Sequence, residues 1–124
     1  MLGKTLLGVS ALVFIAYGLV SLISPAIPAG FAGIQMSNGD AFAEVGAMYG
    51  GLQTGIGMFC LLAILRPGFY QAGLALLAIG IGAMTLARLL SLLVTTDAIS
   101  AYTYGALIYE FVTALVAAIA LVKK

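Results

Sequence analysis

Residues 70–94 read YQAGLALLAIGIGAMTLARLLSLLV, an apolar stretch with a single charged side chain, Arg88. At a helical rise of ~1.5 Å per residue, this stretch is long enough to cross the ~30 Å hydrocarbon core of a bilayer. The chain is 64% hydrophobic and 7% charged, its mean hydropathy is +1.23, and three further stretches have the same character: residues 5–23, 42–65 and 102–122. The sequence therefore predicts an all-α integral membrane protein, built as an antiparallel four-helix transmembrane bundle in one domain over residues 1–124.

The first stretch also has some features of a secretory signal, because Lys4 precedes it. Its apolar part exceeds the ~7–15 residues usual for a signal core, and no clear small-x-small cleavage site follows. We therefore expect residues 5–23 to form a true spanning helix.

Composition excludes several classes of site. Cys60 is the single cysteine and histidine is absent, so the sequence has neither an internal disulfide nor a Cys/His metal site. A net charge of +1 without a basic block argues against nucleic-acid binding. No cofactor is identified by the sequence.

The few charges outside the apolar stretches predict the topology. Lys and Arg are confined to the start of the chain, its end and the connector between the second and third stretches, at Lys4, Arg66, Lys123 and Lys124. The other two connectors carry Asp40 and Asp97 and no basic residue. By the positive-inside rule, both termini and Arg66 lie in the cytoplasm, and connectors 24–41 and 95–101 face outward.

Proline and glycine positions predict local features of the helices. Ser24-Pro25 is expected to end the first helix and Pro28 to prevent an early restart, whereas the cluster 37–40 is expected to cap the second helix. Pro67 is expected to end the second helix at Arg66. Glycines spaced four apart in the second helix predict close helix packing and favour a homo-oligomer or a larger membrane complex: Gly46 with Gly50, and Gly51 with Gly55.

Three ionisable side chains lie within the apolar stretches, namely Glu44, Arg88 and Glu110. A charge near the bilayer centre costs ~2.5–3.5 kcal/mol even on mild insertion scales, so these charges indicate pairing or a site. From the helical rise, Arg88 lies about 9 Å and Glu110 about 12 Å below the outer ends of their helices, but Glu44 only about 3 Å. We therefore expect Arg88 and Glu110 to pair and Glu44 to lie at the rim. Tyr49 and Gln53, one turn apart on the second helix, lie deeper than Glu44.

Three interpretations of this polar cluster stay open. A structural ion pair would fix which helices meet, because a guanidinium binds a carboxylate through two hydrogen bonds. A ligand site would be a small cavity, open to the outer leaflet, in which Arg88 orients a lipophilic molecule. The third is a proton or ion pathway. Because one arginine cannot neutralise two buried carboxylates, Glu44 must be wetted, capped at its helix start, or protonated.

The most specific string in the chain is AEVGAMYGGLQTG, residues 43–55. Together with Arg88 and Glu110, it resembles an uncharacterised bacterial family of small four-helix membrane proteins, a domain of unknown function distantly similar to the DoxX/DoxD-like group. The resemblance implies a bundle whose polar residues gather toward one mouth. Some DoxX/DoxD-like proteins are linked to quinone-dependent oxidation, others to assembly of membrane or redox complexes, so the analogy implies a lipophilic ligand or an accessory subunit.

We expect a non-enzymatic protein of the bacterial inner membrane that binds a lipophilic small molecule, such as a lipid or a quinone, or a partner subunit. In this hypothesis Arg88 anchors an anion or a carbonyl, and Glu110 holds Arg88. Glu44 gates or hydrogen-bonds at the rim, and Tyr49 and Gln53 orient the ligand.

Two alternatives come from other functional classes. One is an accessory subunit of a quinone-linked membrane oxidoreductase, which could not carry electrons alone because the sequence lacks haem-ligating histidine and a cysteine cluster. The other is a small proton-coupled transporter that uses Glu110. Small multidrug exporters place their membrane carboxylate in the first helix, and the first apolar stretch here has no charge.

Overall fold

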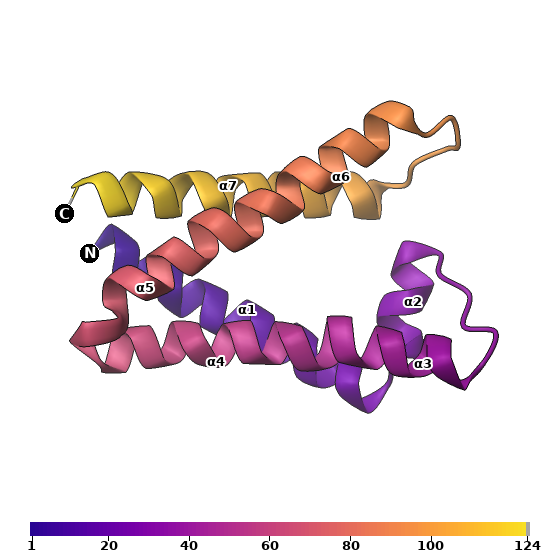
Figure 1. Cartoon of the computed structure of the whole chain (residues 1–124), viewed down its shortest axis with the longest axis horizontal. Helices are drawn as coiled ribbons and strands as arrows, with labels where there is room; N and C mark the ends of the chain where they lie inside the picture. The colour runs from indigo at the N-terminus through magenta and orange to yellow at the C-terminus, as the bar shows by residue number, and fades with distance from the viewer. Residues whose placement is uncertain (124) are drawn as a thin grey trace. The chain divides into compact units, whose positions relative to one another are not determined.

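The regular elements of the computed structural model, which describes residues 1–123, are all helical (Figure 1). The long helix α1 (Leu2–Ile23) is followed by the short helix α2 (Ala26–Ala32). One continuous helix then comprises α3 (Gly39–Val45), η1 (Gly46–Gly51) and α4 (Leu52–Leu65). A second comprises η2 (Pro67–Phe69), α5 (Tyr70–Ala75), η3 (Leu76–Ile81) and α6 (Gly82–Val94), and α7 (Ala101–Lys123) comes last.

Four of these helices are long and apolar enough to cross a membrane: Leu2–Ile23, Gly39–Leu65, Pro67–Val94 and Ala101–Lys123. They coincide with the four predicted stretches. Each helix begins one to three residues earlier than predicted and ends at the predicted residue or one residue later. The helical fold class is therefore confirmed. The antiparallel four-helix bundle, its insertion into a membrane and the single domain stay predictions.

Helix ends follow the predicted local signals except at Pro28. The Asn38 side chain accepts a 2.8 Å hydrogen bond from the backbone N–H of Ala41 and caps α3, and α4 ends before Arg66, whose backbone is extended. The expectation that Pro28 prevents a restart is wrong, because α2 spans it. Pro28 lies in the first turn of α2, where a helix needs no backbone N–H, and proline is tolerated there.

Two of the long helices contain a π-helical segment, η1 and η3. Each segment is bonded by a threonine hydroxyl from the following α-helix: Thr54 donates to the carbonyl of Gly50 at 2.7 Å, and Thr85 donates to that of Ile81 at 2.9 Å. Such bonds satisfy backbone carbonyls that regular helical geometry would otherwise occupy. The two segments are therefore supported features of the fold.

The described chain forms two compact units, residues 8–62 and residues 1–7 with 63–123, and each is described by itself. In unit 8–62, α1 and α4 meet backbone to backbone at glycines. A Cβ built on Gly57 would lie 2.7 Å from the backbone nitrogen of Ile15, and one on Gly50 would lie 2.8 Å from Cα of Leu22. Because later residues of α1 meet earlier residues of the following helix, the two run antiparallel.

The predicted role of the spaced glycines is only partly correct. Gly50 makes the close approach, but a Cβ on Gly51 or Gly55 would meet nothing within 4 Å, and one on Gly46 would meet only Cγ of Pro25 at 3.7 Å. Gly51 and Gly55 lie off the face that packs on α1, because helix periodicity turns them away from Gly50.

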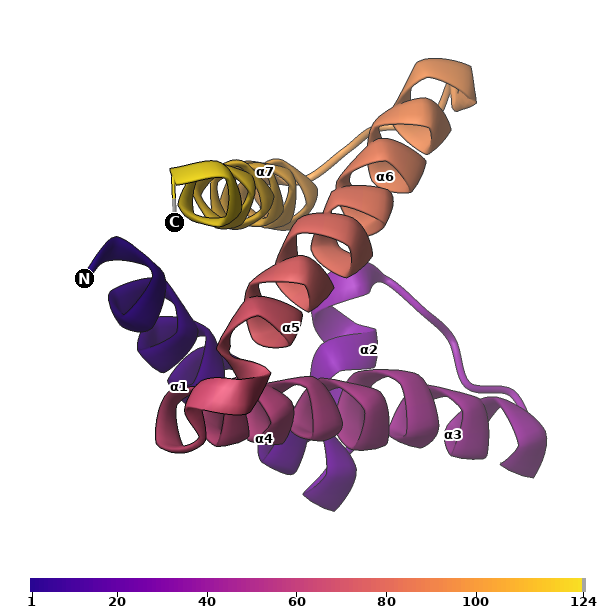
Figure 2. The same ribbon diagram turned by 60° about the vertical axis from the view of Figure 1, so that its left-hand side comes forward.

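In unit 1–7 with 63–123, α7 packs along the continuous helix of α5, η3 and α6. The two helices run in opposite directions and diverge toward connector 95–100 (Figures 1 and 2). Both helices carry buried side chains, namely Leu74, Leu77 and Ile81 on one and Thr113, Ala117 and Ala120 on the other. The helix α6 thus lies beside α7.

Candidate functional site

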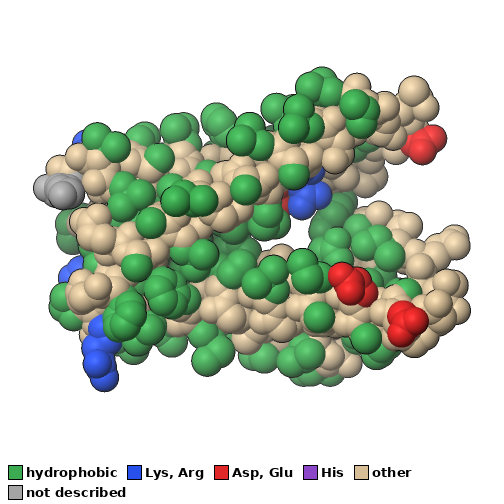
Figure 3. Space-filling view, in the orientation of Figure 1, with side chains coloured by type: hydrophobic (Ala, Val, Ile, Leu, Met, Phe, Trp, Pro, Cys, Tyr) green, Lys and Arg blue, Asp and Glu red, His purple; other side chains and the backbone are tan. Residues whose placement is uncertain are grey.

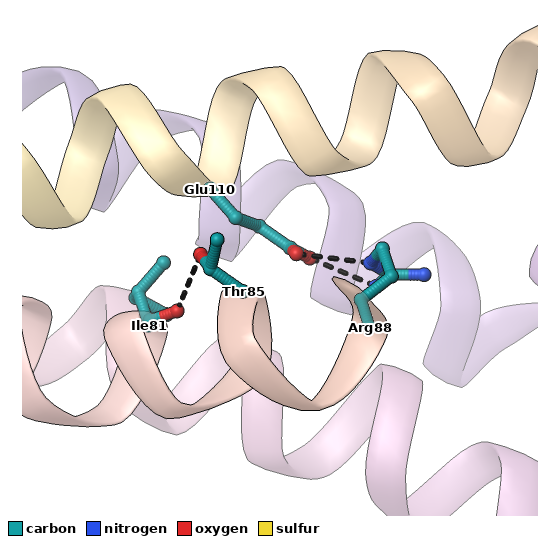
Figure 4. Close-up of polar contacts among 4 residues, drawn as sticks. All are labelled: Ile81, Thr85, Arg88 and Glu110. Carbon is teal, nitrogen blue, oxygen red and sulfur yellow. Dashed lines mark hydrogen bonds and ion pairs between the residues drawn. The ribbon is translucent and has the colours of Figure 1, made fainter. Parts of the chain in front are cut away.

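Arg88 of α6 and Glu110 of α7 form a two-point ion pair (Figure 4). Arg88 Nε donates to Oε1 of Glu110 at 2.9 Å, and Arg88 Nη2 donates to Oε2 at 2.9 Å. Two parallel charge-assisted bonds of this kind are the strong geometry for a guanidinium and a carboxylate. The predicted contact between Arg88 and Glu110 is therefore confirmed.

The two partners differ in exposure. The Glu110 side chain is 7% exposed, whereas that of Arg88 is 27% exposed. Figure 4 shows the third guanidinium nitrogen turned away from Glu110. The carboxylate is therefore covered, whereas part of the guanidinium side chain is accessible.

Neighbouring polar groups on α6 bond to their own helix. The buried Thr85 hydroxyl donates to the carbonyl of Ile81, and the Ser91 hydroxyl donates to that of Ala87 at 2.8 Å. On α7, Thr113 lies one turn beyond Glu110 and is 3% exposed. The ion pair is therefore the charged centre of this helix face, and the hydroxyls around it stabilise the helices that carry it.

An apolar groove adjoins the pair between η3, α6 and α7. It has a volume of about 470 Å³, within the range of small-molecule sites, and its walls include Gly82, Ala83, Leu86 and Phe111. Among the described residues that line the groove, Thr85 is the one whose side chain carries a hydroxyl group. Neither member of the pair lines the groove, but two lining residues are close to the pair in sequence: Thr85 precedes Arg88 by three positions, and Phe111 follows Glu110.

Comparison with known proteins places the chain in a family. The sequence profile described as "Domain of unknown function (DUF4345)" matches residues 2–121. The chain belongs to the DUF4345 family. No curated protein and no solved structure matches it significantly. Membership of DUF4345 confirms the resemblance to a family of unknown function, whereas bacterial origin and the likeness to the DoxX/DoxD-like group stay predictions.

The remaining candidate residues of this DUF4345 chain lie in the unit of residues 8–62. Glu44 is exposed in α3, Tyr49 is half-buried in η1, and Gln53 is half-buried in α4. Their helix begins at Gly39 rather than at residue 42, because Asn38 caps it, so Glu44 lies about 7 Å from the helix start and does not cap it. Their participation in one site with Arg88 stays a prediction.

Sequence reasoning missed Thr85 and the groove. Thr85 is the polar residue nearest to Arg88 on its N-terminal side. Its spacing of three from Arg88 could have indicated that the two share a helix face. The groove depends on small side chains from two different helices, and no sequence motif predicts that these side chains face each other. Among residues 1–123 no group of three His, Cys, Asp or Glu side chains could hold a metal ion.

Proposed function

We propose that this chain is a multi-pass protein of a bacterial inner membrane that binds a lipophilic molecule in the groove between α6 and α7. The polar end of that molecule would lie against the Arg88–Glu110 pair. The observation that carries the proposal is an ion pair with a partly exposed donor, carried by the same two helices that form an apolar groove.

Membrane placement is supported by large apolar side chains exposed in the middle of the helices. Leu12 is 72% exposed, Ile79 73% and Ile108 64%, and Figure 3 shows apolar side chains along α6. Contiguous apolar surfaces of this kind are rare on soluble proteins, and hydrocarbon is a solvent that suits them. Lys4 and Lys123, at the ends of their helices, and Arg66, in a connector, favour cytoplasmic termini by the positive-inside rule.

The pair also indicates the chemistry of the ligand's polar end. Glu110 already balances the charge of Arg88, so a full anion would add an uncompensated charge in apolar surroundings. A neutral carbonyl accepts hydrogen bonds from a guanidinium without adding charge. A quinone or a lipid ester, with its ring or tail in the groove, therefore fits this site better than a carboxylate or a phosphate.

The transporter alternative has less support than binding. A proton carrier has to load and release a proton at Glu110, and each cycle would break two charge-assisted hydrogen bonds. An accessory subunit of a quinone-linked oxidoreductase is compatible with the proposal, because such a subunit would bind the same class of molecule.

The test fills the groove while leaving the pair intact. Ala83 lines the groove, whereas Ala87, one turn further along α6, is exposed and does not line it. Ala83→Phe should abolish stabilisation by decylubiquinone in thermal unfolding of the detergent-solubilised protein and remove co-purifying lipophiles detected by native mass spectrometry. Ala87→Phe should leave both unchanged. Equal behaviour of the two variants would refute the groove as the binding site.

A second variant separates binding from structure. Exchanging the charges, as Arg88→Glu with Glu110→Arg, should restore much of the stability that either single change removes, because an ion pair can reform. The exchanged protein should still fail to bind decylubiquinone, since the donor would then stand on the other helix. Recovery of both stability and binding would assign the pair a purely structural role.

A further inference from the structure

Two further cavities lie in the unit formed by residues 1–7 and 63–123, at the end where α1 begins and α7 finishes. One has a volume of about 390 Å³ and is lined by Gly3, Tyr70, Gln71 and Lys123, among others. The other, about 220 Å³, is lined by Lys4, Pro67 and Tyr70 together with apolar neighbours. Tyr70 is the residue common to both cavities.

The position of Tyr70 is fixed by the start of α1. Gly3 is buried, and a Cβ built on it would collide with the Tyr70 hydroxyl and lie 2.9 Å from the ring carbon that bears it. Only a glycine lets α1 come this close to the tyrosine. The contact holds the hydroxyl in place beside the wall that the two cavities share.

The charges of this unit are separated along its length. Lys4, Arg66 and Lys123 belong to the end where α1 begins and α7 finishes. The acidic residues of the unit, Asp97 and Glu110, lie elsewhere: Asp97 in the connector after α6, and Glu110 in the ion pair. Figure 3 shows blue side chains at the first end and a red one at the tip beyond α6.

The side chains around the cavities are suited to a phosphate group. Lys123 and Lys4 supply ammonium groups, and the Tyr70 hydroxyl and the Gln71 amide can donate hydrogen bonds. Basic pockets between helices on the cytoplasmic side of a membrane bind anionic lipid headgroups, and each nearby lysine contributes about 1 kcal/mol of attraction to an anionic surface. Tyr70 begins α5 and Lys123 ends α7, which places these groups at headgroup depth.

We propose that this end of the protein binds the headgroup of an anionic phospholipid, with the phosphate in the cavity between Tyr70, Gln71 and Lys123. Lys4, which lines the neighbouring cavity together with Tyr70, adds to the positive potential. The inference rests on the membrane placement in the proposed function. It does not depend on the α6–α7 groove.

The experiment measures lipid binding to the full chain by native mass spectrometry from detergent, with dioleoyl-phosphatidylglycerol and dioleoyl-phosphatidylcholine as probes. Phosphatidylglycerol should bind at least about tenfold more tightly. Lys123→Gln should weaken its binding about fivefold, and Tyr70→Phe, which keeps the ring against Gly3, should weaken it by a similar factor. Arg66→Gln removes one charge at the same end but lines neither cavity, so its effect should be less than about twofold.

Several results would overturn the inference. Equal binding of the two lipids would show that the headgroup charge is not recognised. Equal effects of Lys123→Gln and Arg66→Gln would show that the lipid is attracted by surface charge and not bound in a defined site. Competition by free glycerol phosphate at the same concentration as the lipid would indicate a soluble anion as the ligand. Flotation with phosphatidylcholine vesicles tests membrane placement separately: a wild-type chain that does not float refutes both proposals. The variant Ala83→Phe should retain phosphatidylglycerol, because its cavity is a different one.

Discussion

Replacing Glu110 with glutamine should lower the free energy of unfolding by about 2–3 kcal/mol, because Arg88 loses the charge that two 2.9 Å hydrogen bonds now bind. Removing one partner of a buried ion pair costs ~3–5 kcal/mol. Arg88 is 27% exposed, so its charge is partly solvated and the loss should fall below that range. The glutamine keeps the volume of the side chain and one hydrogen-bond acceptor.

The opposite single change should be more costly. Arg88→Met leaves the Glu110 carboxylate, 7% exposed, beside apolar groups, and the expected loss is about 3–5 kcal/mol. The double variant Arg88→Met with Glu110→Gln removes both charges and should lose less than the two single losses added together. The cycle should therefore give a coupling energy of about 2 kcal/mol or more.

Reversible unfolding in mixed micelles of dodecyl maltoside and sodium dodecyl sulfate, followed by far-UV circular dichroism, measures these differences. Leu86→Met, an exposed apolar exchange on the same helix, is the matched control and should stay within about 0.5 kcal/mol. Losses that simply add, with a coupling energy below about 0.5 kcal/mol, would refute the reasoning. The interaction between Arg88 and Glu110 would then contribute little to the free energy of unfolding.

Three further predictions concern the helices that carry the sites. Gly50→Leu should destabilise the protein by at least about 1–3 kcal/mol because its side chain would enter the backbone of α1, whereas Gly55→Leu, with open space around it, should be near neutral in the same unfolding assay. Thr85→Val should cost about 0.5–1.5 kcal/mol through loss of its bond to η3, with Ser91→Ala as an exposed comparison. Cysteines placed at Asp97 and Arg66 should react with an impermeant maleimide from opposite sides of the membrane, and the wild-type chain serves as the blank because Cys60 is 0% exposed. Labelling of both from one side would contradict the topology.

The length of the apolar stretches made the main helices predictable from the sequence. Four such stretches, each long enough to cross a bilayer, correspond to the four long helices. The Arg88–Glu110 contact was predicted because two opposite charges lie in apolar stretches and the helical rise places them at nearly the same depth. Apolar length, charge and position along a helix can all be read directly from a sequence.

Features that depend on local geometry or on two helices together were not predictable. Pro28 was expected to interrupt a helix, yet its place in the first turn of α2 is compatible with one. Gly51 and Gly55 have the spacing of a packing motif, but the partner helix lies against Gly50 and Gly57. The groove beside Thr85 exists because small side chains of α6 face small side chains of α7. The sequence of one helix does not show which residues of the other helix it will face.

The π-helical segments have a consequence for how the chain tolerates changes in length. A π turn holds one more residue than an α turn between the same two flanking faces. Deleting a residue within η1, for example Gly51, can therefore be absorbed by conversion to regular α-helix. The residues on either side would keep their orientation, so α4 would still present Thr54 and Gly57 to α1. The same deletion placed in α4 would rotate everything beyond it by about 100°.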